Sequence, residues 1–99
     1  MYTIEVAASA EKELRALRPF DQKAVIAAIE GQLTTEPAVE TRNRKELVNL
    51  VPPFEATPPV WELRVGKFRV FYDVDDVQKK VFVRAVRRKP PHRTTEEIL

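Results

Sequence analysis

Hydrophobic and polar residues alternate through much of the C-terminal half of the chain. In residues 61–65 the apolar side chains take every second position, so Glu62 and Arg64 point away from the apolar side. The same two-residue period continues in residues 68–73 and 80–88, where arginines stand among hydrophobic residues. The pattern predicts three antiparallel strands, with arginines gathered on one face of the sheet.

Turn residues separate and end these strands. The first two strands are predicted to turn at Gly66-Lys67, and the acidic segment 73–78 joins the second to the third. Pro90-Pro91 ends the sheet, because proline has no N–H to donate to a ladder. Thr94 or Thr95 is then expected to cap a last helical turn.

The N-terminal part predicts one strand and two helices. Residues 2–6 alternate as a short strand, and Ser9 is the expected N-cap of a helix that Pro19 stops near Arg18. Asp21 is the expected cap of a second helix that extends to about Thr34. Apolar residues recur at helical spacing in both segments: Ala10, Leu14 and Leu17, then Val25, Ile26, Ile29 and Leu33.

Residues 36–60 have no sustained period and hold five of the eight prolines, which predicts a long connection with one turn near residues 45–48. The order of elements predicts an α+β fold in a single domain, residues 1–99. An N-terminal strand and a two-helix hairpin precede a three-stranded antiparallel meander, all strands forming one sheet. The helices are expected to cover one face and to leave the other for function.

Composition excludes several classes of protein. The 99 residues are 43% hydrophobic and 32% charged, which is ordinary for a globular domain. No apolar run approaches the roughly 20 residues that span a bilayer, so no membrane role is expected. The absence of cysteine excludes disulfides and thiolate zinc sites, and a single histidine gives little for an imidazole site. We therefore expect a cytoplasmic protein with no metal and no cofactor.

Basic residues concentrate in the C-terminal half. Residues 1–41 hold four Lys or Arg against seven Asp or Glu, whereas residues 42–99 hold thirteen against eight, and the net charge is +2. Residues 84–93 hold five cations and no acid. Such a segment would attract phosphate backbones or an acidic protein partner, and the alternative is a solvated basic edge.

The chain resembles the RelE/ParE superfamily of type II toxins over nearly its whole length, and in particular the ribosome-dependent messenger RNA interferases. The resemblance rests on the apolar start, the two short helices, the RKEL segment at residues 44–47 and, above all, residues 61–73 (WELRVGKFRVFYD). That run is close to the family's hairpin pattern of an arginine, a glycine turn and a second arginine before an apolar and aromatic stretch.

The resemblance implies a toxin that enters the ribosomal A site, cuts the bound messenger without a metal, and is neutralised by a cognate antitoxin. Attack by the ribose 2′-OH needs a base, a cation for the pentavalent phosphate, and an acid for the leaving oxygen. Arg69 matches the family's hairpin arginine and Arg64 a basic position on the preceding strand. A guanidinium suits the phosphate because its planar fork contacts two oxygens at once.

The resemblance leaves the base and the acid open. Glu62 stands where some relatives have lysine, and Glu46 lies in the basic loop where one branch places a glutamate. Glu62 has a structural alternative, which is pairing with Arg64 or Arg69 across the hairpin. Arg88 and His92 are the candidate acids. Five further cations are expected to bind RNA: Arg44, Lys45, Lys67, Arg84 and Lys89.

No aromatic residue follows Phe82, so the family's C-terminal tyrosine, which stacks on a base, is missing. This departure keeps other functions open. One alternative is a non-enzymatic toxin that inhibits DNA gyrase, as in the ParE branch. Another is a toxin-fold protein that binds a partner without cutting, and a third is a general nucleic-acid-binding domain.

Overall fold

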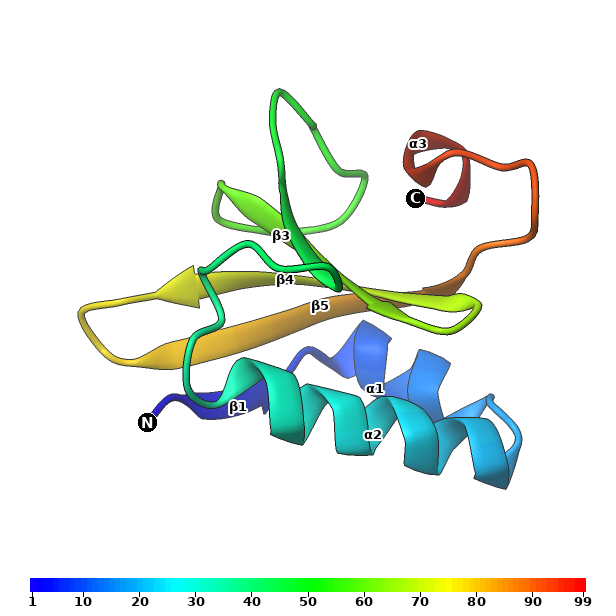
Figure 1. Cartoon of the computed structure of the whole chain (residues 1–99), viewed down its shortest axis with the longest axis horizontal. Helices are drawn as coiled ribbons and strands as arrows, with labels where there is room; N and C mark the ends of the chain where they lie inside the picture. The colour runs from blue at the N-terminus through cyan, green and yellow to red at the C-terminus, as the bar shows by residue number, and fades with distance from the viewer.

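The computed structural model describes residues 1–99 as one five-stranded sheet with three helices (Figure 1). The elements in chain order are β1 (Thr3–Val6), α1 (Ala8–Arg15), α2 (Pro19–Leu33), β2 (Arg44–Leu47), β3 (Val60–Val65), β4 (Phe68–Asp75), β5 (Lys80–Arg88) and α3 (Thr95–Ile98). The strand order is β1-β5-β4-β3-β2, with β1 parallel to β5 and the other neighbours antiparallel. This arrangement confirms the predicted α+β fold. None of the helices has the length and apolar content needed to cross a membrane.

The main core lies between the sheet and the pair α1 and α2, which Figure 1 shows on one side of the strands. Trp61 and Leu63 of β3 point into this core, as their alternation predicts, and Trp61 stacks on Tyr72 with ring centroids 6.3 Å apart. Ala10 and Leu14 of α1 meet them, together with Val25, Ile29 and Leu33 of α2. A fully buried Val, Leu or Ile side chain stabilises the fold by roughly 1.5–3 kcal/mol. Because side chains alternate along a strand, the neighbours of these core residues project from the opposite face of the sheet.

The other face of the sheet is partly covered, so the expectation that the helices leave it open is wrong in part. Val60, Phe71 and Ala85 form a second, smaller cluster there. The residues that pack on this second cluster come from β2, from the loop before β3 and from the C-terminus: Leu47, Phe54, Ala56, Ile98 and Leu99. Figure 1 shows α3 on this side, opposite α1 and α2. The C-terminal turn and the proline-rich loop therefore restrict access to the face.

Residues 44–47 form the edge strand β2, where the sequence pattern predicted a connection with a turn. Glu46 pairs with Trp61 and Lys45 with Glu62, so the antiparallel meander has four strands. Hydrogen bonds to β3 create this strand, since its charged residues lack hydrophobic alternation. The buried Arg44 side chain anchors it by donating from Nε to the Val39 carbonyl at 3.1 Å and from Nη1 to the Gln32 carbonyl.

The helix boundaries correct three details of the sequence interpretation. The N-cap of α1 is Ala7, and Ser9 lies inside the helix with its hydroxyl donating to the Arg84 carbonyl at 3.4 Å. Pro19 begins α2 at the first helical position, where its missing N–H costs nothing, and α1 has already ended at Arg15. Asp21 lies in the first turn of α2 rather than at its cap.

The C-terminal cap follows the prediction. Thr94 and Glu97 form a reciprocal capping box at the start of α3. The Thr94 backbone N–H donates to the Glu97 carboxylate at 2.8 Å, and this bond lowers the Glu97 pKa below its ordinary value of 4.5.

Candidate functional site

A row of arginines crosses the face opposite to α1 and α2. Arg64 of β3 pairs with Arg69 of β4, and Arg69 pairs with Arg87 of β5. Directly opposed residues in a sheet project from the same face. The register therefore confirms that Arg64 and Arg69 share a face, and it adds Arg87.

Arg69 is nearly buried, with 7% of its surface exposed. Its Nη1 donates to the carbonyls of Gly66 and Phe68, each at 2.8 Å, across the turn in which Gly66 has a φ of 56°. Burial lowers the Arg69 pKa, the negative charge of Glu62 opposes that shift, and Arg64 adds to it. A guanidinium remains charged at neutral pH in spite of such a shift. Arg69 thus places a fixed cation on the strand next to the exposed Arg64.

Glu62 of β3 lies two residues before Arg64 and on the same face of the sheet. It is buried, it pairs with Lys45 of β2, and its Oε2 accepts a hydrogen bond of 2.8 Å from the Thr95 hydroxyl at the start of α3. Beside it lies a shallow polar hollow of about 60 Å³, with no hydrophobic residue in its lining. The residues that line the polar hollow are Arg42, Asn43, Arg44, Lys45, Glu62 and Arg64.

Arg88 lies on the opposite face from Arg64 and Arg69. It pairs with Phe68, whose ring belongs to the main core, so its side chain leaves the sheet on the side of α1 and α2. The cause is an irregularity in the pairing of β4 with β5. Phe71 pairs with Ala85 and Tyr72 with Val83, which leaves Arg84 between them without an opposed residue. One extra residue reverses the alternation beyond it.

Arg84 and Arg87 are both engaged in the fold. Arg84 binds Asp73 through Nε at 2.6 Å and through Nη2 at 3.2 Å, and Asp73 also accepts the Thr57 N–H at 3.1 Å. Arg87 forms an ion pair with Glu13 and lies 6.0 Å from the centroid of the Phe54 ring. Sequence reasoning missed Asp73 as a partner, although its position in the β4 alternation places it on the arginine face.

The family model described as "ParE toxin of type II toxin-antitoxin system, parDE" matches residues 4–89. The chain belongs to this family of toxins. No curated protein matches it at a significant level.

Solved structures of similar proteins have the same fold. The chain is similar to a chain in the toxin–antitoxin complex RelBE2 from Mycobacterium tuberculosis, with 26% identity, a TM-score of 0.72, and coverage of 89% of this chain and 98% of that one. The fold is also that of the isolated Escherichia coli RelE toxin, at 20% identity and a TM-score of 0.72, covering 97% and 90%. A chain of the archaeal RelE–RelB complex from Pyrococcus horikoshii has 21% identity and a TM-score of 0.69, covering 94% and 98%.

The other candidate residues of the toxin are dispersed. Glu46 pairs with Trp61 and so lies on the opposite face from Glu62. His92 is exposed, with a φ of 70°, in the connection between β5 and α3. Lys67 is exposed at the hairpin turn, and its carbonyl accepts the Lys89 N–H at 2.7 Å. Of the predicted set, the structure brings Arg44, Lys45, Glu62 and Arg64 together around the polar hollow, with Arg69 paired to Arg64. Lys67 and Arg88 line a separate cavity on the side of α1 and α2.

No group of three or more His, Asp or Glu side chains in the chain is arranged to hold a metal ion.

Proposed function

We propose that this toxin is a ribosome-dependent endoribonuclease that inhibits translation by cutting messenger RNA. The observation that supports this function best is the polar hollow, where the Glu62 carboxylate lies among exposed cations next to the Arg64 and Arg69 pair. A phosphodiester would find cations for its oxygens and a carboxylate for a proton within one small surface. The reaction would be an attack of the ribose 2′-OH on the adjacent phosphate, with no metal.

In this mechanism Arg69 and Arg64 stabilise the pentavalent phosphate. Arg69 is held in place by the Gly66 and Phe68 carbonyls, so little reorganisation is needed when negative charge develops. Arg64 is exposed and free to contact the incoming phosphate. The polar hollow adds Lys45 for the neighbouring phosphates.

Glu62 is the better candidate for the base, because it shares a face with Arg64 whereas Glu46 does not. Its bond with the Thr95 hydroxyl would have to open so that the carboxylate reaches the 2′-OH. His92 is the better candidate for the acid, since Arg88 leaves the sheet on the other side. His92 is three residues before Thr95, so its backbone lies within roughly 11 Å of the residue that contacts Glu62.

The partners in this proposal are a cognate antitoxin, the ribosome and its messenger. One similar structure is described as a toxin–antitoxin complex and another as a RelE–RelB complex, which supports an antitoxin for this chain. The exposed cations Arg42, Lys45 and Arg64 favour an acidic segment of that antitoxin over the polar hollow. The other four cations of the predicted RNA-binding set, Arg44, Lys67, Arg84 and Lys89, differ in availability, since Arg44 and Arg84 already bind groups within the fold.

A second candidate function is inhibition of DNA gyrase without catalysis. The matching family model is that of ParE toxins, and the gyrase-directed branch shares the scaffold. The absence of any aromatic residue after Phe82 and the separation of Arg88 from Arg69 also favour a binder.

One experiment distinguishes the two. The purified toxin is added to translating ribosomes and, separately, to a DNA gyrase supercoiling reaction. We expect in-frame cuts within A-site codons that leave 5′-hydroxyl ends, with supercoiling unaffected. Intact messenger with inhibited supercoiling would replace the endonuclease with the gyrase inhibitor, and intact messenger with active gyrase would indicate a toxin fold that only binds.

A further inference from the structure

Phe20 is an exposed aromatic side chain with no role in the core. It is the second residue of α2, and 84% of its surface is accessible. It lies beside the β3–β4 hairpin and lines an aromatic slot of about 270 Å³. The residues that line the aromatic slot are Phe20, Asp21, Ala24, Val65, Gly66, Lys67 and Phe68. A single exposed phenylalanine is common, but one that forms a wall of a hollow has a surface to offer a ligand.

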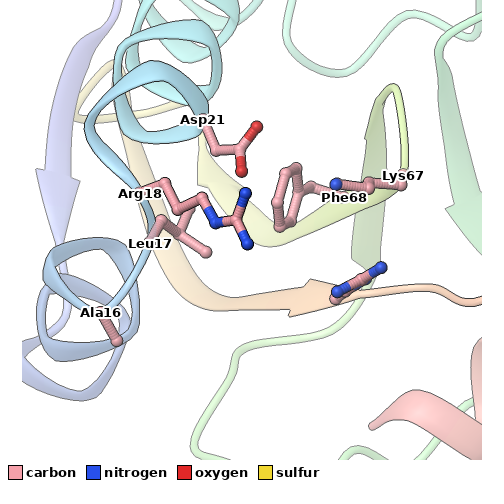
Figure 2. Close-up of a pocket in the computed structure, with 7 residues that line it drawn as sticks. Ala16, Leu17, Arg18, Asp21, Lys67 and Phe68 are labelled. Atoms are coloured by element: carbon pink, nitrogen blue, oxygen red, sulfur yellow. The ribbon is translucent and has the colours of Figure 1, made fainter.

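A second cavity of about 280 Å³ adjoins the aromatic slot and shares Asp21, Lys67 and Phe68 with it. It adds two more exposed cations, Arg18 and Arg88. In Figure 2 the Arg18 and Lys67 side chains extend toward the Phe68 ring, the first from the start of α2 and the second from the hairpin. Lys67 Nζ lies 5.7 Å from the centroid of that ring.

The two cavities together place a free aromatic ring beside three cations and one acid. Single-stranded nucleic acids are bound by this combination, in which a base stacks on an aromatic face and cations follow the backbone. None of the three cations has an ion-pair partner in the fold, unlike Arg84 and Arg87. Their charge is therefore available to a phosphate.

We propose that the aromatic slot binds one nucleotide of single-stranded RNA, with its base stacked on Phe20 and its phosphates on Lys67 and Arg88. This inference rests on the proposed endonuclease function and names a second contact for its substrate. Gly66 and Lys67 form the turn of the hairpin whose strands carry Arg64 and Arg69 on the other face. An RNA strand that crosses this turn meets both surfaces.

The test measures binding of a fluorescein-labelled oligouridylate of about ten nucleotides to the isolated toxin at low salt. Phe20→Leu keeps an apolar side chain but removes the stacking face, and it should weaken binding by roughly 5- to 150-fold. Phe20→Tyr keeps the ring and should bind like the wild type. Val51→Leu alters another exposed apolar residue, 91% accessible, and serves as the matched control. Lys67→Ala and Arg88→Ala should each reduce the slope of log K against log salt by about 0.7.

Equal binding by Phe20→Leu and the wild type would overturn the site, and so would a toxin that does not bind the oligonucleotide. If Phe20→Leu instead loses affinity for the antitoxin while RNA binding is unchanged, the aromatic slot is a protein contact and the proposal is wrong. Cleavage on ribosomes is scored separately. Messenger cutting without Phe20-dependent RNA binding rejects the slot alone, whereas Phe20-dependent binding without cutting rejects the endonuclease alone.

Discussion

Replacement of Arg84 by methionine should strongly destabilise the fold, although its position in a basic segment suggested an RNA contact. Arg84 binds the Asp73 carboxylate through two nitrogens, and it also lies 4.9 Å from the centroid of the Phe82 ring. The Asp73 side chain is only 2% exposed and that of Arg84 is 16% exposed. Methionine keeps much of the packing on Phe82, so Arg84→Met mainly removes the charge.

The expected loss in the free energy of unfolding is about 3–5 kcal/mol, because the substitution leaves an uncompensated carboxylate in the interior. The Thr57 N–H would be the one remaining partner of Asp73. Since small domains unfold with roughly 5–15 kcal/mol, this loss removes a large share of the total. The midpoint of thermal unfolding should fall by about 12 °C or more.

Urea unfolding followed by circular dichroism gives this free energy directly. The second variant, Asp73→Asn with Arg84→Met, removes the buried charge and keeps an oxygen for Thr57, so it should recover most of the stability. A matched control, Arg18→Met, alters an exposed arginine and should change stability by less than about 0.5 kcal/mol. Wild-type stability in Arg84→Met, or no recovery in the double variant, would refute the structural role and return Arg84 to the candidate RNA contacts.

Three further outcomes test the fold. Tyr72→Phe should cost about 1–3 kcal/mol in urea unfolding, since the buried Pro37 carbonyl loses the Tyr72 hydroxyl that donates to it at 2.6 Å, and an unchanged midpoint would contradict this bond. Gly66→Ala should cost about 1–2 kcal/mol by the same measurement, because φ is 56° while nothing contacts the added methyl group. The ionised Glu97 carboxylate stabilises the α3 cap above pH 4.5, because its hydrogen bond to the Thr94 backbone lowers its pKa. This stabilisation is lost as the pH falls through the lowered pKa. The protection of the Thr94 amide against hydrogen exchange, expressed relative to the intrinsic exchange rate at each pH, should therefore fall on acidification. Glu97→Gln should remove that dependence.

The sequence predicted the hairpin because Trp61 and Leu63 alternate with Glu62 and Arg64, and the apolar pair belongs to the main core. A slip of one residue would expose Trp61 and Leu63 and bury Arg64, so the pattern allows one pairing. The shared face of Arg64 and Arg69 follows from the same argument. The edge strand β2 was not predictable in this way, since residues 44–47 become a strand through pairing with β3 and not through their own alternation.

The position of Arg88 shows what local patterns miss. If β5 alternated throughout, Arg88 would share a face with Phe82, which pairs with Asp73. The extra residue at Arg84 reverses the alternation, and no glycine or proline marks that position in the sequence. The burial of Phe71 was also not predictable from local patterns, because Phe54 and the C-terminal residues that pack on it come from distant parts of the chain.

The most direct test of the proposed function compares two cation deletions in messenger cutting on translating ribosomes. Arg64→Ala removes the exposed guanidinium beside Glu62, and Lys23→Ala removes an exposed cation from α2, on the other side of the sheet. With both variants folded by circular dichroism, Arg64→Ala should cut about 100- to 1000-fold more slowly than the wild type. Lys23→Ala should cut at the wild-type rate. Equal cutting by all three proteins would contradict a catalytic surface built on the Arg64 and Arg69 pair.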